Sequence, residues 1–205
     1  MEEFRGSFRK KLKEIVSLAN ENPKYEDSTS TKIRMFFHDE TRLGLIPVQR
    51  RRITLRGVKP VGKIQHNFES YYLYGAVEPL NGEGFFLELP YLNSDNFQVF
   101  LNEFFKEYSS GLNIIVLDNG SFHKAKKLRI PENVIFLFLP AYSPELNPIE
   151  RLWEDIKGQI AFEIYGSLEA LKNRIAEIIK NYTNQMIRSL TSYPYVINAI
   201  YDAFQ

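Results

Sequence analysis

Three acidic side chains of this chain stand where carboxylates could bind divalent metal ions. Asp39 and Asp118 each follow directly after an apolar run that predicts a buried strand, and Glu150 follows a third such run across a short turn. The turn carries several prolines and an Asn-Pro step, which favour a rigid connection into a helix. Hard divalent cations prefer oxygen ligands such as carboxylates. The three side chains are therefore candidate metal ligands if the fold brings them together.

Hydrophobic periodicity predicts the elements that must position these residues. A helix is expected over residues 4–20, followed by a polar segment to residue 31. Asn81-Gly82 marks a hairpin turn between two of the strands. The strands are expected at 33–38, 71–77, 84–89, 112–117 and 134–139, and further helices at 95–108, from about 147, and at 167–182.

The order of these elements predicts an α/β fold of the ribonuclease-H-like type. Three strands form a meander and are followed by helix, strand, short helix, strand and helix, which gives a mixed sheet of about five strands with helices on both faces. In this arrangement the first- and fourth-strand aspartates, Asp39 and Asp118, can lie side by side, with Glu150 facing them from a helix. Only such a fold makes one site of residues so far apart in the sequence.

Composition sets the outer bounds. The chain has 205 residues, 44% of them hydrophobic, which suits a soluble globular domain with a full core. The absence of cysteine excludes disulfides and thiolate metal sites. The sequence has no run of about 18 apolar residues for a membrane span and no signal-peptide core near the N-terminus. We therefore expect a cytoplasmic protein without a membrane partner.

Clustered basic residues are more informative than the net charge of +1. A basic run follows Asp39 in the sequence, and a second one follows Asp118. Basic groups near an acidic metal site suit a phosphate-backbone substrate, although for any single run a solvated surface is the simpler interpretation. The residues expected to contact DNA are Arg50, Arg51, Arg52, Arg56, Lys124 and Lys126.

Three motifs resemble those of a known family. They are FHDE at 37–40, LDN at 117–119 with His123 nearby, and PAYSPELNPIE at 140–150 with Trp153 after it. With these motifs the chain resembles the catalytic domain of DDE transposases of the mariner-like superfamily, in particular the bacterial insertion-sequence branch. Ala141 stands where the family usually has proline. The last motif is the most specific of the three.

The resemblance implies a function and a division of the chain. Asp39, Asp118 and Glu150 would be the catalytic carboxylates and would bind Mg²⁺ or Mn²⁺, with two ions expected, while Asn119 and His123 would support them from behind. The reaction would be DNA cleavage by water and joining of a 3′-hydroxyl end to target DNA. Residues 1–31 would form an N-terminal helix and linker, and residues 32–205 the ribonuclease-H-like catalytic domain.

Each residue also has a simpler interpretation. The two aspartates could be strand-end turn formers, and Glu150 could simply favour the first turn of its helix. Glu40 should point away from Asp39, because neighbours on an extended segment face opposite sides, and we expect it at the surface or paired with basic residues.

Three further residues have structural alternatives as well. His123 could equally be a capping or packing residue. Asn119 is expected to shape the turn after its strand. Trp153 is expected to pack its helix onto the sheet.

The long segment 41–68 and the short N-terminal region predict partners. A long loop inside a compact domain is usually functional or disordered. By resemblance it would hold DNA or a second subunit, so we expect a homodimer. About thirty residues before the first catalytic strand are too few for a helix-turn-helix module, so we expect a separately encoded recognition half or a truncated gene.

Other functions stay open on the sequence alone. Another ribonuclease-H-like nuclease or integrase would keep the three carboxylates and change the substrate. An inactive or repurposed transposase-derived module would bind DNA or assist assembly without cleaving. A glycosidase that uses two carboxylates is the remote third possibility.

Overall fold

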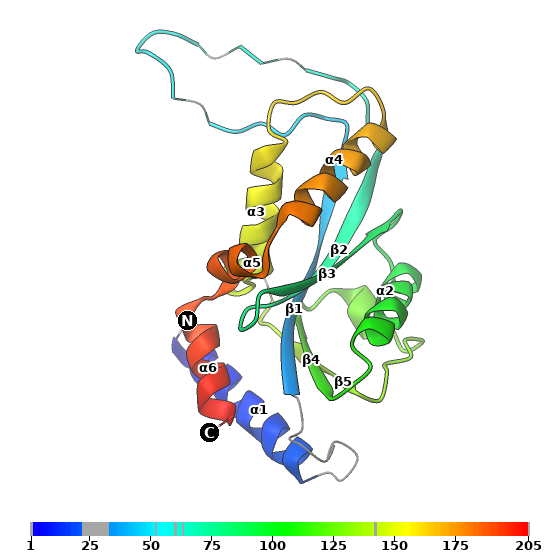
Figure 1. The fold of residues 1–205 in the computed structure, drawn as a ribbon, viewed down its shortest axis with the longest axis vertical. Helices are drawn as coiled ribbons and strands as arrows, with labels where there is room; N and C mark the ends of the chain where they lie inside the picture. Colours follow the sequence, from blue (N-terminus) through cyan, green and yellow to red (C-terminus); the bar gives the residue numbers. More distant parts are fainter. Residues whose placement is uncertain are drawn as a thin grey trace.

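A mixed five-stranded sheet forms the centre of the molecule (Figure 1). The computed structural model describes residues 2–21, 33–51, 53–59, 61–62, 64–141 and 143–204. The strand order is β3-β2-β1-β4-β5, in which β1 pairs antiparallel with β2 and parallel with β4. The predicted mixed sheet of five strands is confirmed. The strands are β1 (Ile33–Gly44), β2 (Ser70–Glu78), β3 (Glu83–Leu89), β4 (Leu112–Leu117) and β5 (Val134–Phe138).

The strand β1 is longer than predicted. The sequence expectation ended this strand at residue 38, where the apolar run stops, but β1 continues to Gly44. Its second half pairs with β2 alone, from Asp39 opposite Gly75 to Gly44 opposite Ser70. Backbone pairing supplies the hydrogen bonds of this half whatever the side chains are, so charged residues do not end the strand. Asp39 therefore lies inside a strand, and the prediction that it stands at a strand end was wrong.

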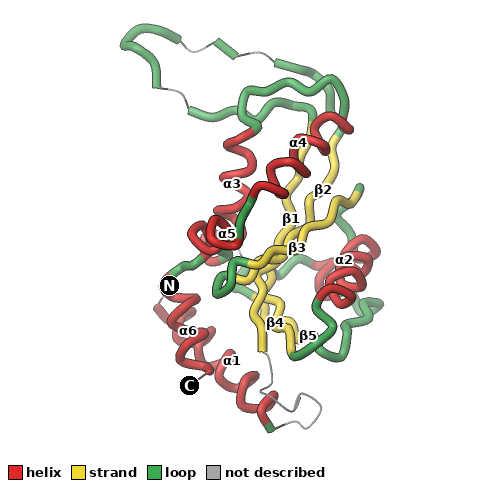
Figure 2. Tube along the Cα trace, viewed as in Figure 1, coloured by secondary structure: helices red, strands yellow, loops and turns green. Residues whose placement is uncertain are grey.

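Helices cover both faces of the sheet (Figure 2). The helix α2 packs on one face, where its buried phenylalanines meet Phe36 of β1. The other face carries Phe37 of β1 in one core with α3, α4 and α5. Alternate residues of β1 thus enter different cores, as the pleat of a strand requires. The helices are α1 (Glu2–Asn20), α2 (Ser94–Glu107), α3 (Ile149–Gln159), α4 (Leu168–Asn181), α5 (Asn184–Thr191) and α6 (Pro194–Phe204).

The N-terminal helix belongs to the main core. Phe8 and Leu12 of α1 are buried together with Val196 and Ile200 of α6, and the two helices lie side by side near the chain ends (Figure 1). The sequence analysis predicted α1 but neither α5 nor α6. Among the described helices, none combines the length and apolar character needed to cross a membrane. The expected cytoplasmic location stays a prediction.

The connection from β1 to β2 projects from the end of the domain (Figure 1). Its described residues between 45 and 69 form no helix or strand, in agreement with the predicted irregular segment, although residues 41–44 belong to β1. Its base is tied to the domain by a hydrogen bond from the Phe162 amide to the Val48 carbonyl at 3.0 Å. Its outer part exposes Ile53, Leu55 and Val61. Arg52, which was predicted to contact DNA, lies outside the described residues.

Candidate active site

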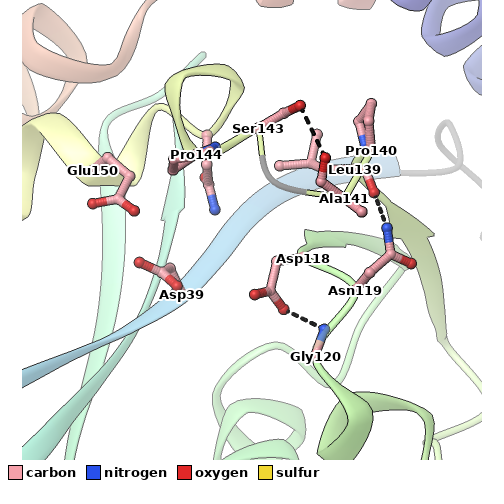
Figure 3. A pocket seen from close by; sticks show the side chains of 11 residues that line it. Asp39, Asp118, Asn119, Gly120, Leu139, Pro140, Ala141, Ser143, Pro144 and Glu150 are labelled. Carbon is pink, nitrogen blue, oxygen red and sulfur yellow. Dashed lines mark hydrogen bonds between the residues drawn. The ribbon is translucent and has the colours of Figure 1, made fainter.

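The three carboxylates singled out by the sequence line one cavity (Figure 3). The cavity has a volume of about 360 Å³, and Asp39, Asp118 and Glu150 share its wall with Asn119 and Asn147. Figure 3 shows the Asp39 and Glu150 carboxylates close to each other, with Asp118 pointing toward Asp39 from across the opening. The fold therefore brings together side chains that are far apart in the sequence.

Strand register places the two aspartates level with each other. Phe37 of β1 pairs with Val116 of β4 in a parallel ladder, so the same offset places Asp39 beside Asp118, just after β4 ends. Glu150 comes from the first turn of α3, which follows a short 3₁₀ helix at Pro144–Leu146. Buried Ile149 and Leu152 hold α3 against the sheet. The segment after β5 thus leads into a helix whose first turn carries Glu150, as the sequence predicted.

The carboxylate of Asp39 is held from the α3 side. The indole Nε1 of Trp153 donates a hydrogen bond of 2.9 Å to Oδ2 of Asp39. The indole fits because the cross-strand partner of Asp39 is Gly75, where an added Cβ would lie 2.5 Å from the Trp153 ring. Trp153 packs its helix onto the sheet, as predicted. Its hydrogen bond to Asp39 was missed, because only the tertiary structure brings the two together.

Negative charge is unfavourable at two of the three carboxylates in the protein alone. Burial raises the pKa of Asp39 well above its usual range, the charges of Glu40 and Glu150 raise it further, and the hydrogen bond from Trp153 only partly opposes this. Burial also raises the pKa of Glu150, against the nearby charge of Lys157. A cation would remove this penalty. The donor set of three carboxylates therefore fits a hard divalent ion such as Mg²⁺ or Mn²⁺.

Asp118 has the opposite environment. Its Oδ1 atom accepts hydrogen bonds of 2.8 Å from both the Nδ1 atom of His123 and the Gly120 amide. The hydrogen bond from His123 outweighs burial and lowers the pKa of Asp118. The side chain of Asp118 is 58% exposed, whereas that of His123 is only 1% exposed. The predicted place of His123 behind the site agrees with this geometry.

Glu40 lies beneath the site and not at the surface. Its side chain is 5% exposed, and its Oε1 atom lies 2.8 Å from Nε2 of His38 and 3.1 Å from Nε2 of His123. The surface position expected from the sequence was wrong. Glu40 can be buried because two histidines supply the hydrogen-bond partners that water would supply at the surface. The expected direction, away from Asp39, is confirmed. Burial acts to raise the pKa of Glu40, but His38 and His123 lower it to about 2.

Two asparagines connect the strand ends around the cavity. The amide of Asn119 donates to the Leu139 carbonyl, and its oxygen accepts from Lys124. Asn119 thus joins the ends of β4 and β5, which agrees with the predicted role in shaping the turn. The amide of buried Asn147 donates to the His38 carbonyl at 2.9 Å and ties the proline-rich segment to β1. Asn147 was not singled out from the sequence, although it lies within the most specific motif.

The described residues among those predicted to contact DNA lie outside the cavity wall. Arg50 donates to the Glu154 carbonyl on α3, and Lys124 contacts Asn119. Arg51, Arg56 and Lys126 are exposed. None of these described basic residues lines the cavity itself. Their contact with DNA stays a prediction.

A family sequence profile matches most of the chain that forms this site. The profile is described as DDE superfamily endonuclease and matches residues 34–172. The chain belongs to this family. All three carboxylates of the cavity fall within the matched residues. The predicted relation to DDE enzymes is therefore confirmed.

This DDE family member is similar to a curated protein over part of its length and to solved structures over most of it. An uncharacterized protein of Sinorhizobium fredii (strain NBRC 101917 / NGR234), y4pE/y4sA, is 39% identical over 84 residues, which are 40% of this chain and 62% of that protein. The Mos1 strand transfer complex has a similar fold, with a TM-score of 0.63 and 17% identity over 97% of this chain and 62% of that one. The Mos1 mariner paired end complex with Mn gives a TM-score of 0.63 and 18% identity over 95% and 61%.

The likeness to Mos1 confirms the predicted ribonuclease-H-like fold. The DDE family chain spans about 62% of the length of the relatives it matches. At 16–18% identity the likeness to Mos1 establishes the fold and leaves the activity to be argued from the site.

Proposed function

We propose that this chain is the catalytic domain of a metal-dependent DNA transposase, which cleaves phosphodiester bonds and joins 3′-hydroxyl ends to target DNA. The observation that carries the proposal is the single cavity lined by Asp39, Asp118 and Glu150 in a DDE superfamily endonuclease. The Mos1 complexes with a similar fold contain a transposon end or represent strand transfer, which supports DNA as the substrate here.

In this proposal Asp39, Asp118 and Glu150 bind two Mg²⁺ or Mn²⁺ ions. Bound in this way, the ions would activate the attacking oxygen and stabilise the leaving oxygen in an in-line displacement. Trp153 orients Asp39, and His123 with the Gly120 amide orients Asp118. The protein contributes rigid placement of its carboxylates, and no side chain has to form a covalent intermediate with DNA.

The DNA backbone would cross the cavity between the two basic regions. Lys124 stands at the rim through its contact with Asn119, and Arg50 stands beside α3 through its contact with the Glu154 carbonyl. Basic residues at such positions would neutralise phosphates and orient the strand. We assign this role to Arg50, Arg51, Arg52, Arg56, Lys124 and Lys126.

We also propose a homodimer and a separate recognition half. The β1–β2 connection exposes Ile53, Leu55 and Val61 beside arginines, a combination that suits contact with a second subunit and with DNA. Sequence-specific recognition of the transposon ends would come from a helix-turn-helix region outside this chain. Analytical ultracentrifugation with and without DNA tests the dimer, and a monomer in both cases would contradict it.

Nicking of supercoiled plasmid tests the proposed activity directly. The protein is incubated with plasmid in Mg²⁺ or Mn²⁺, with Asp118→Ala and chelator as paired controls. We expect metal-dependent nicking that Asp118→Ala lacks. Nicking that survives in the variant would show that the activity does not come from this site. DNA binding without cleavage, even with the recognition half added in trans, would favour a repurposed DNA-binding module.

A further inference from the structure

A chain of hydrogen bonds runs through the protein interior to the back of Asp118. The Gly75 carbonyl lies 2.8 Å from Nδ1 of His38, whose Nε2 lies 2.8 Å from Oε1 of Glu40. The same Glu40 oxygen lies 3.1 Å from Nε2 of His123, and Nδ1 of His123 lies 2.8 Å from Oδ1 of Asp118. The side chains of His38, Glu40 and His123 are at most 5% exposed. The chain thus connects β2, β1 and the segment after β4.

The acceptors on both sides of His123 determine how its ring is oriented. An ionised carboxylate accepts hydrogen bonds and donates none. His123 stands between Glu40 and Asp118, so it must donate from both ring nitrogens. Rotation of the ring would break both hydrogen bonds together and leave buried polar atoms without partners, which is unfavourable. Glu40 therefore holds the imidazole in the single orientation that reaches Asp118.

The fixed imidazole determines which oxygen of Asp118 is available to a ligand. The hydrogen bonds from His123 and from the Gly120 amide both end on Oδ1. The other carboxylate oxygen points toward Asp39 across the cavity in Figure 3. A carboxylate whose one oxygen is fixed by hydrogen bonds presents the other oxygen in a defined direction. Such a side chain loses less conformational entropy when an ion binds, which favours binding.

We propose that Glu40, acting through His123, is a positioning residue that orients Asp118 toward the metal-binding cavity. The inference rests on the proposed function, since it assigns Asp118 as a metal ligand. Glu40 does not line the cavity, and His123 stands between Glu40 and Asp118. Glu40 can therefore act on Asp118 only through His123. Histidine ligands of metals are commonly oriented by carboxylates behind them, and here a histidine and a carboxylate orient a carboxylate ligand in the same way.

The surroundings of this chain argue against a role in packing alone. His123 lies 4.5 Å from the Phe97 ring and 4.1 Å from the Phe122 ring, and His38 lies 4.4 Å from the Phe100 ring, measured between centroids. Apolar side chains would fill such an aromatic core at lower desolvation cost than two histidines and a glutamate. The polar chain is better explained by the site that it supports.

The same three buried residues also offer a competing arrangement. One ligand atom from each of His38, Glu40 and His123 lies within 4.8 Å of the others, which would suit a transition metal ion held in place of the hydrogen bonds. The contact lengths of 2.8 and 3.1 Å are those of direct hydrogen bonds, and each ring nitrogen of both histidines has an acceptor. Metal analysis of the purified protein separates the two arrangements.

Substitutions at Glu40 test the proposal. Glu40→Leu removes the acceptor, whereas Glu40→Gln retains an acceptor oxygen at the same distance from the backbone. Glu78→Leu is the matched control: Glu78 is also a buried glutamate of the sheet, and it accepts from Arg34 at 2.5 Å without lining the cavity. If Glu40→Leu does not fold, His123→Gln replaces it, because the glutamine amide has both N–H donors on one nitrogen and does not reproduce the two opposed donors of the imidazole.

The readouts are Mn²⁺ affinity by calorimetry, melting temperature, and plasmid nicking as a function of Mn²⁺ concentration. We expect Mn²⁺ affinity to fall by about 10- to 100-fold in Glu40→Leu and less in Glu40→Gln, as for other partners behind metal ligands. Nicking by Glu40→Leu should recover in part at high Mn²⁺. Glu78→Leu should melt at a lower temperature and bind Mn²⁺ as the wild type does.

Three results would overturn the proposal. The first is unchanged Mn²⁺ affinity in a folded Glu40→Leu or His123→Gln variant. The second is an equal loss of affinity in Glu78→Leu, which would mark a general effect of stability. The third is one equivalent of tightly bound transition metal in the wild type that Glu40→Leu lacks. Wild-type protein that binds Mn²⁺ without cleaving DNA would count against the proposed function alone, and the affinities would still test Glu40.

Discussion

Asp39 and Asp118 line the same cavity, yet their surroundings shift their pKa values in opposite directions. Asp39 lies inside β1, where burial and two neighbouring carboxylates raise its pKa well above the usual range. Asp118 follows β4 and is largely exposed, and the hydrogen bond from His123 lowers its pKa. The contrast indicates a division of work. In the proposed metal site, Asp118 would carry its charge before an ion binds, whereas Asp39 would need the ion to make its charge favourable.

The largest expected effect would show that both aspartates are needed despite this contrast. Metal-dependent nicking should fall by more than about 100-fold in each of the variants Asp39→Asn, Asp118→Asn and Glu150→Gln. Each variant loses a charged metal ligand, and even the loss of a residue that only orients a ligand costs about 10- to 100-fold. Single-turnover cleavage at fixed Mn²⁺ measures this. Circular dichroism must show that each variant is folded. Full activity of any one variant would remove that residue from the site.

The indole of Trp153 provides a way to weaken the Asp39 side alone. Trp153→Phe keeps an aromatic ring against Gly75 but removes the donor to Asp39. We expect about a 10-fold loss of Mn²⁺ affinity, the lower end of the range for residues that orient metal ligands. Phe86→Leu is a suitable control, because Phe86 packs edge-on against the Trp153 ring without contacting Asp39. Equal losses in both variants would mean that packing, and not the hydrogen bond, matters.

Stability in the absence of metal should separate the two aspartates by sign. Asp39→Asn removes a charge that burial disfavours and should raise the free energy of unfolding at pH 7, by on the order of 1 kcal/mol. Asp118→Asn removes a favourable partner of His123 and should lower it, by less than about 1 kcal/mol because Asp118 is exposed. Urea titrations with chelator measure both. A change of the same sign in the two variants would contradict the comparison.

Another expected effect is a pH dependence of stability caused by His123. Burial acts to lower the pKa of His123, but hydrogen bonds and charges from Asp118 and Glu40 raise it from 6.5 to about 9. A raised pKa stabilises the folded state fully below the unfolded value of 6.5, and this contribution is lost as pH rises through 9. Metal-free protein should therefore melt at lower temperature as pH approaches 9. His123→Gln should lack this decline between pH 6.5 and 9, and a parallel decline in the variant would assign it to other groups.

Much of the fold was predictable because local patterns and tertiary structure agree. The hairpin at Asn81-Gly82 formed as predicted, with Gly82 at a φ of 71° that favours glycine. The helix predicted at 95–108 lies at Ser94–Glu107. The prediction failed where tertiary contacts override local pattern. Pairing with β2 carries β1 six residues beyond the apolar run, to Gly44.

The sequence by itself determined the chemistry of the site, because the three carboxylates stand in specific motifs next to strands and a rigid turn. Only the tertiary structure decided how each carboxylate is held. Glu40 and His123 are 83 positions apart, and Asp39 and Trp153 are 114 apart. Local periodicity extends over a few residues and cannot encode such pairings. The packing of helices on the sheet brings these residues together. Glu40, which we expected at the surface, is therefore buried beneath the cavity.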